Sequence, residues 1–150
     1  MTSNVQAFLA MLSHSEGTDR YPLSDHGYNV LVGGSLFTGY ADHPRKLVRL
    51  SATLSSTAAG RYQVMERTYD DLHKRAHIPD FTPSSQDAMA VELIRECGAL
   101  PLIEAGQFAA AVAKVAHIWA SLPGAGYGQR ENKLAALETA YVAAGGVSNG

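Results

Sequence analysis

Residues 4–17 read NVQAFLAMLSHSEG, and this stretch directs the interpretation of the fold. Its apolar side chains recur at i, i+3, i+4 and i+7, the spacing of one face of an α-helix, at Val5, Phe8, Leu9 and Leu12. Gly17 then supplies a residue that tolerates the left-handed geometry common just after a helix. The stretch therefore predicts an amphipathic helix over residues 4–16, with Glu16 in its last turn.

Glu16 continues the apolar face of this helix, because it follows Leu12 by four residues and Phe8 by eight. Its carboxylate should be partly desolvated, and burial raises the pKa of a carboxylate toward the range that a general acid needs. The alternative is a glutamate that reaches solvent from a helix end. The last turn of a helix disfavours negative charge, so a purely structural role would suit Lys or Arg better. Glu16 is therefore a candidate catalytic acid.

The segment after this helix carries short bursts of β-branched and aromatic residues at 28–32, 36–40 and 47–50. Turn-forming residues separate the bursts, which indicates a small antiparallel sheet or β-rich lobe. Helical spacing then dominates the rest of the chain, over about 65–76, 83–98, 100–104, 108–119 and 134–141. This order is typical of an α+β domain. We expect one domain over residues 1–150, with a cleft between a small β lobe and a larger helical body.

Composition narrows the classes of function. The net charge of −2 and the pI near 6.3 provide no basic field that would attract nucleic acid. Cys97 is the only cysteine, which excludes an intrachain disulfide and a cysteine-ligated zinc site. The N-terminus does not read as a secretory signal, and no apolar run reaches the ~20 residues of a membrane span. We expect a soluble protein made in a cytoplasm, with neither a nucleic-acid nor a membrane partner.

Ser15-Glu16-Gly17-Thr18 resembles the catalytic helix end of the bacteriophage lambda lysozyme family of lytic transglycosylases. The resemblance continues in the same order along residues 5–146, in blocks at 7–9, 26–28, 32–34, 36–38, 42–48, 60–63, 85–88 and 118–129. The longest block reads IWASLPGAGYGQ. Blocks of this length are far more specific than a three-residue pattern, so the chain is identified as a member of that family.

The resemblance implies a lysozyme-like fold in which Glu16 is the single catalytic acid. Such an enzyme cleaves the β-1,4 bond between N-acetylmuramic acid and N-acetylglucosamine without water and leaves a 1,6-anhydro-N-acetylmuramic acid end. It needs no second carboxylate, and we expect no cofactor and no metal. One alternative is a hydrolytic muramidase supported by Asp19 or Asp25, although both are expected at the surface. The other is a catalytically inactive glycan-binding module, which the retention of Glu16 disfavours.

The resemblance also implies which side chains hold the glycan strand. Tyr62 and Gln63 lie in a segment that lines the cleft in lytic transglycosylases, although spacing alone makes that segment the start of a helix. Tyr127 and Gln129 belong to one of two mobile loops beside the cleft, and the other loop lies around residues 46–55. Tyr127 suits stacking on a sugar ring and, equally, packing within its own loop. The glycines of that loop are only a near miss to a nucleotide-binding motif, so a nucleotide site is not expected.

Tyr28 and Asn29 follow a turn of the predicted β lobe and are expected to face the cleft. The family's namesake carries an aspartate at position 29. A hydrolytic mechanism needs a second carboxylate or a base that activates water, and Asn29 can serve as neither. Asn29 and Gln63 are instead expected to steady the N-acetyl group or the sugar ring.

Three other features have structural interpretations. His73 and His77 have a spacing that can hold a metal, but the basic residues between them mark a solvated face, so no metal site is predicted. Trp119 continues an apolar stripe and is expected in the core. Cys97 is expected to be a packing residue.

The resemblance implies phage-mediated lysis as the biological setting. The protein would accumulate in the host cytoplasm as a monomer. It would reach the periplasm through a holin-type pore and act there on the glycan strands of the cell-wall peptidoglycan.

Overall fold

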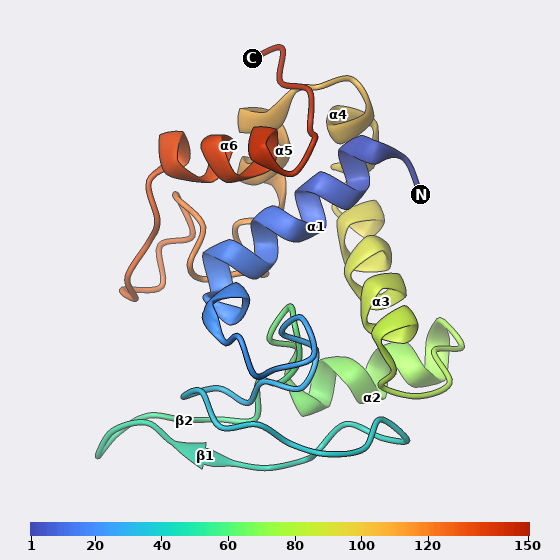
Figure 1. The fold of residues 1–150 in the computed structure, drawn as a ribbon, viewed down its shortest axis with the longest axis vertical. Helices are drawn as coiled ribbons and strands as arrows, with labels where there is room; N and C mark the ends of the chain where they lie inside the picture. Colours follow the sequence, from blue (N-terminus) through green and yellow to red (C-terminus); the bar gives the residue numbers. More distant parts are fainter. The chain divides into compact units, whose positions relative to one another are not determined.

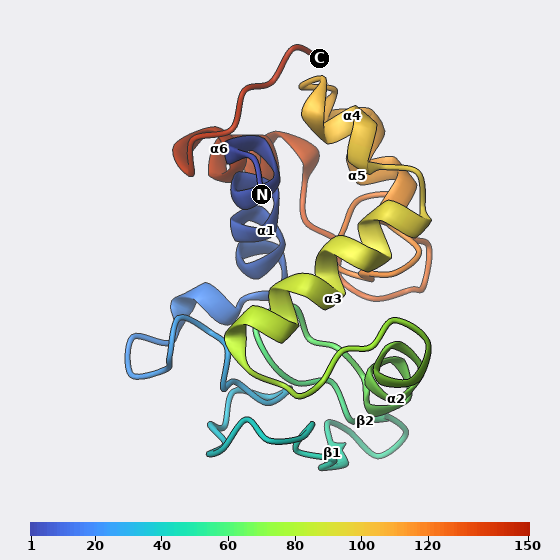
Figure 2. The same cartoon turned by 90° about the vertical axis from the view of Figure 1, so that its right-hand side faces the viewer.

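The computed structural model describes residues 1–150, which form two compact units. The helical unit comprises residues 1–16 and 91–150, and the mixed unit comprises residues 17–90. Figures 1 and 2 show the elements of each unit. Helix α3 (Pro83–Glu96) begins in the mixed unit and ends in the helical unit. No helix combines the length and the apolar composition that a membrane crossing requires.

The helical unit is built around its N-terminal helix. Besides the end of α3, its elements are α1 (Ser3–Glu16), α4 (Leu100–Glu104), α5 (Phe108–Val115) and α6 (Leu134–Ala143). Helix α1 packs against α6 and α4, and α4 packs against α5 (Figure 1). The Phe8 ring is fully buried and meets Phe108 and Tyr141 edge-on, at centroid distances of 6.0 and 6.4 Å. Because each such buried side chain contributes about 1.5–3 kcal/mol, this cluster fixes α1 and therefore the position of Glu16.

The predicted helices are confirmed, with one difference in length. The helix predicted over 65–76 is α2 (Glu66–Arg75), and the structure adds a short 3₁₀ helix, η1 (Thr18–Arg20), in the mixed unit. The helix predicted over 108–119 ends as an α-helix at Val115. Trp119 lies in the turn that follows and is only 3% exposed, so its placement in the core is confirmed. Cys97 is half-buried, with its Sγ 3.8 Å from His117 Nε2.

The mixed unit contains less strand than the sequence predicts. Strand β1 (Val48–Arg49) pairs antiparallel with β2 (Ser55–Ser56), so the predicted mobile loop over 46–55 holds most of a hairpin. The bursts at 28–32 and 36–40 are joined by a single bridge instead of a ladder. Gly33 and Gly34, with φ angles of 89° and 104°, form the tight turn between the two bursts. A Cβ at Gly34 would lie 2.7 Å from the hydroxyl oxygen of Tyr21, so the turn requires glycine.

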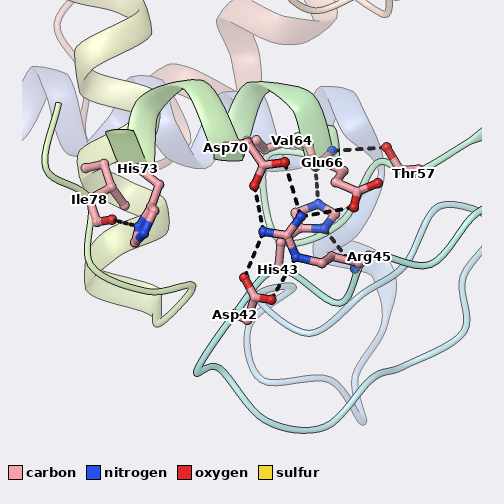
Figure 3. A network of polar contacts seen from close by, with 9 residues as sticks. All are labelled: Asp42, His43, Arg45, Thr57, Val64, Glu66, Asp70, His73 and Ile78. Atoms are coloured by element: carbon pink, nitrogen blue, oxygen red, sulfur yellow. Dashed lines mark hydrogen bonds and ion pairs between the residues drawn. The ribbon is translucent and has the colours of Figure 1, made fainter. Parts of the chain in front are cut away.

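A polar cluster holds the start of α2 against the chain that leads to β1 (Figure 3). Buried His43 accepts from the Arg45 backbone N–H at its Nδ1, at 3.0 Å. Its Nε2 therefore carries the proton and donates to the Val64 carbonyl at 2.8 Å, and burial lowers the pKa of His43. The exposed Arg45 side chain pairs at 2.7, 3.0 and 2.6 Å with three carboxylates, those of Asp42, Glu66 and Asp70.

The histidine pair that was considered as a metal site lies at the other end of α2, with His73 in the helix and His77 after it. His73 donates from its Nδ1 to the Ile78 carbonyl at 2.5 Å, as Figure 3 shows. Its ring also stacks on Tyr69, with centroids 5.6 Å apart. The fold therefore gives His73 a packing role, and His77 lies beyond the helix with a positive φ of 57°.

Candidate active site

Glu16 is the last residue of α1, and Gly17 directly after it adopts the left-handed conformation, with a φ of 80°. The side chain is partly buried, as the position of Glu16 on the apolar face of the helix predicts. Burial raises the pKa of Glu16 from 4.5 to about 7, although a hydrogen bond from Ser121 acts in the opposite direction. Near neutral pH the group therefore exists in both protonation states. This is the property that a general acid needs when it must later act as a base.

A series of hydrogen bonds connects Glu16 to Ser121 and Asn132, which both lie between α5 and α6. The Ser121 hydroxyl donates to Glu16 Oε2. The Ser15 and Ser121 hydroxyl oxygens lie 2.7 Å apart, and Asn132 Nδ2 donates to Ser15 Oγ at 3.1 Å and to the Ser15 carbonyl at 3.0 Å. All four residues belong to the helical unit, so this arrangement is a property of that unit alone.

The glycine-rich loop before Asn132 has a defined conformation. The Glu131 carboxylate accepts from the backbone N–H groups of Gly124 and Gly126, at 2.9 and 3.0 Å. Tyr127 donates its hydroxyl to the His117 carbonyl at 2.6 Å and is 55% exposed as a residue, while Gln129 is also exposed. The Tyr127 ring is therefore available to a ligand, and the roles of Tyr127 and Gln129 in glycan binding stay predictions.

Two tyrosines with predicted roles in substrate binding meet in the interior of the mixed unit. Tyr28 and Tyr62 both donate their hydroxyls to Asp87 Oδ1, at 2.8 and 2.5 Å. The Arg61 guanidinium lies over both rings, 5.2 and 5.8 Å from their centroids, and donates to the Tyr28 hydroxyl at 3.1 Å. Tyr62 is only 1% exposed and Tyr28 only 8%. Their hydroxyls are therefore committed to the fold, which favours an indirect contribution to substrate binding.

The side chains of Gln63 and Asn29 each use only one end of the amide group in hydrogen bonds within the protein. Gln63 has a φ of 52°, and its Nε2 donates to the carbonyls of Val30 and Gly60 at 3.1 and 2.8 Å. Both amide hydrogens are thus engaged, and the side chain offers its carbonyl oxygen as an acceptor. Asn29 is the reverse case, because its Oδ1 accepts from the Asp25 backbone N–H at 2.8 Å. Asn29 therefore offers its amide N–H groups.

The two candidate second carboxylates lie at the surface, as predicted. Asp19 is exposed within the 3₁₀ helix after α1. Asp25 is also exposed and accepts the hydroxyl of Tyr40 at 2.7 Å.

Comparison with known proteins relates this geometry to a family. The profile of the Endolysin family matches residues 6–148. The chain belongs to the endolysin family. The endolysin of Escherichia phage lambda is 53% identical over 143 residues, which cover 94% of this chain and 90% of that protein. The endolysin of Escherichia phage P2 is 46% identical over 155 residues, covering 96% and 94%.

Solved structures of endolysins agree with this membership. A bacteriophage lambda lysozyme complexed with a chitohexasaccharide superposes with a TM-score of 0.97 at 50% identity, covering 99% of this chain and 98% of that one. A second bacteriophage lambda lysozyme gives a TM-score of 0.93 at the same identity and coverage. The predicted lysozyme-like α+β fold is confirmed. As an endolysin, the protein is a lysozyme-like enzyme of phage lysis that degrades peptidoglycan.

Sequence reasoning did not assign roles to four polar residues of this endolysin. Ser121, Ser15 and Asp87 lie inside the blocks that carry the family resemblance, which was the one available signal. Asn132 gave no signal, because neither spacing nor residue type shows that it meets Ser15 across 117 positions. The block around Asp87 likewise did not show that this carboxylate lies between two tyrosine hydroxyls.

Proposed function

We propose that this endolysin is a lytic transglycosylase in which Glu16 is the only carboxyl group that takes part in the chemistry. It would cleave the β-1,4 bond between N-acetylmuramic acid and N-acetylglucosamine and form 1,6-anhydro-N-acetylmuramic acid. The observation that carries the proposal is the pKa of about 7 at Glu16, which burial and one hydroxyl set without a contribution from any other carboxylate. A single group with this pKa can serve as acid and then as base.

In the proposed reaction, protonated Glu16 donates its proton to the oxygen that bridges the two sugars. The bond from that oxygen to C1 of the muramic acid breaks, and positive charge develops at C1. Glu16 is now a carboxylate and accepts the proton of the C6 hydroxyl of the same sugar. The C6 oxygen forms the new bond to C1, so the atoms balance without water. Intramolecular attack has a high effective molarity, which replaces the positioning of a water molecule.

The environment of the other carboxylates supports this mechanism over hydrolysis. A retaining hydrolase places a second carboxylate about 5 Å from the acid, and an inverting one needs a base that activates water. Asp19 and Asp25 are exposed, and Asp25 accepts the Tyr40 hydroxyl. Glu131, which lies in the same unit as Glu16, is occupied by two loop amides. Asn29 has an amide in place of a carboxyl group, so it cannot act as an acid or a base.

The proposed binding roles follow from the atoms that each side chain leaves available. The Gln63 carbonyl oxygen would accept from a sugar amide or hydroxyl, and the Asn29 amide would donate to a carbonyl. Tyr127 would stack on a sugar ring and Gln129 would contact the strand, while Tyr28 and Tyr62 support the surrounding backbone through Asp87. The substrate class is peptidoglycan glycan, and the chitohexasaccharide bound to the lambda lysozyme gives a practical probe.

The proposed setting is release from the host cytoplasm into the periplasm. The monomeric enzyme would pass through a holin-type pore made by a separate protein and then meet the cell wall.

Product analysis tests the chemistry. Purified peptidoglycan is digested in ¹⁸O-labelled water, and the muropeptides are analysed by mass spectrometry before and after borohydride reduction. We expect unlabelled anhydro ends that resist reduction, and no products from Glu16→Gln, which keeps the shape of the side chain but has no labile proton. Mostly reducible, labelled ends would instead indicate a muramidase, and Asp19→Asn and Asp25→Asn would then identify its second carboxylate. Binding of glycan without any product would indicate an inactive module.

A further inference from the structure

We propose that Ser121 is a positioning residue that makes Glu16 Oε2 a permanent acceptor, so that the catalytic proton is carried and delivered by Oε1. Ser15 and Asn132 continue the series of hydrogen bonds beyond Ser121, and they determine which hydroxyl donates and which accepts. This inference rests on the proposed role of Glu16 as the acid. It adds which oxygen acts and which side chains decide it.

The donor and acceptor roles in this series of hydrogen bonds are set first at Asn132. Its Nδ2 is 3.0 Å from the Ser15 carbonyl oxygen and 3.1 Å from Ser15 Oγ. A carbonyl oxygen can only accept, so the amide atom that faces Ser15 must be the NH₂ group and not the oxygen. Both hydrogens of that group are then used, one on each Ser15 oxygen. Asn132 is therefore a donor that cannot reverse its role.

The hydroxyls of Ser15 and Ser121 extend the same order of donor and acceptor to Glu16. Ser15 Oγ accepts from Asn132, and its own hydrogen points to Ser121 Oγ, 2.7 Å away. Ser121 Oγ accepts that hydrogen and directs its own to Glu16 Oε2. Each hydroxyl has one hydrogen, so every donor in the series is used once and every acceptor has its partner. When Glu16 is ionised this is the only possible direction, because the carboxylate has no hydrogen to donate. When Glu16 is protonated the same direction is favoured, because the reverse series would leave the hydroxyl hydrogen of buried Ser15 without a partner.

This pattern separates the two oxygens of Glu16. Oε2 receives the Ser121 hydrogen in both protonation states, so the proton of the acid form resides on Oε1. Oε1 would then donate to the bridging oxygen and later accept from the C6 hydroxyl. Fixing one oxygen also stops the carboxyl group from rotating between the two steps, which keeps the reacting atom in place.

The backbone makes the arrangement rigid. The Asn132 backbone N–H donates to the Ser121 carbonyl at 2.7 Å, so Asn132 holds Ser121 through its main chain and Ser15 through its side chain. The Leu122 N–H donates to the Trp119 carbonyl at 3.0 Å, and both of these neighbours of Ser121 are buried. Ser121 is thus fixed from both sides of the chain, as a positioning residue requires.

The test removes the hydroxyl and then restores it. Ser121→Ala should lower kcat about tenfold while KM for peptidoglycan changes less than twofold. The variant should also move the pKa of Glu16 upward by about one pH unit, because it removes a donor to the carboxylate. The pKa is followed through the ¹³C shift of the Glu16 carboxyl carbon and through the basic limb of the kcat profile. Ser121→Thr, which restores a hydroxyl, should recover at least half of kcat and the original pKa.

Two variants of Asn132 test the direction, and one variant elsewhere serves as control. Asn132→Asp keeps the shape but replaces the donor by an acceptor, so it should lower kcat more than Asn132→Ala does. Thr139→Ala deletes a hydroxyl from an exposed position of α6, where it donates to the Ala135 carbonyl, and should change neither kcat nor the Glu16 titration. Thermal unfolding of each variant confirms that it is folded under the assay conditions.

The outcomes separate this inference from the proposed function. If Glu16→Gln retains activity, the catalytic assignment fails and the inference fails with it. If Glu16→Gln is inactive but Ser121→Ala keeps the original kcat and Glu16 pKa, only the positioning role is overturned. A Ser121→Thr variant as impaired as Ser121→Ala, or equal effects of Asn132→Asp and Asn132→Ala, would also overturn it.

Discussion

The charge on Glu16 should lower the stability of the protein above neutral pH. Folding raises the pKa of this group from 4.5 to about 7. Since each pKa unit corresponds to about 1.36 kcal/mol, the fully ionised side chain reduces the free energy of unfolding by about 3 kcal/mol. Between these two pH values the folded state binds more protons than the unfolded state, so stability falls as the pH rises through this window. Below pH 4.5 the penalty is absent, and above pH 7 it is complete.

Glu16→Gln removes this ionisation and provides the measurement. At pH 8 the variant should exceed the wild type by up to about 3 kcal/mol in urea unfolding, or by about 6–12 °C in melting temperature. The difference should shrink as the pH is lowered toward 4. Glu96→Gln, at an exposed position of α3, is the matched control and should leave the pH dependence unchanged. If the wild type and Glu16→Gln lose stability in parallel as the pH rises, the carboxylate is not desolvated in the folded protein.

Three further predictions concern the loop and the interior of the mixed unit. Glu131→Gln should accelerate hydrogen exchange of the amides in 124–126 and weaken chitohexasaccharide binding several-fold at an unchanged melting temperature; unaltered exchange would contradict the role of this carboxylate. Shortening the loop over 124–128 should weaken glycan binding more than it lowers the melting temperature, and the opposite ranking would make the loop a structural element. Tyr62→Phe removes one hydroxyl from Asp87 and should lower the free energy of unfolding by about 1.5–3 kcal/mol in urea titrations, whereas a neutral result would show that solvent replaces the bond.

The helices could be predicted because each carries its own periodic signal. Residues 4–16 show an apolar stripe whose period survives in the structure, with Phe8 and Leu12 fully buried. The strands could not be predicted to the same extent. Their bursts satisfy a residue-type preference, but the bursts at 28–32 and 36–40 meet only in the bridge between Val30 and Leu36. Strand formation depends on packing against cross-strand neighbours, which residue types alone do not show.

The candidate site divides in the same way. Glu16 was predictable, since its place on the helix stripe and the local sequence around it both lie within one short segment. Its partner Ser121 is 105 residues away and Asn132 is further still, and no local pattern states that α1 meets the chain after α5 at this point. Long-range polar partners depend on packing, and the sequence of one chain does not display packing directly.

The position of Glu16 at the end of α1 explains why a donor is useful there. The negative end of the helix dipole and burial both oppose ionisation, so together they would hold the carboxyl group protonated. A group held in that state would be a poor base in the second half of the proposed reaction. The Ser121 hydroxyl opposes both influences, and because Asn132 and Ser15 direct it, it does so without accepting the proton itself. The resulting pKa of about 7 reflects this balance, which lets one carboxyl group give up a proton and take one back.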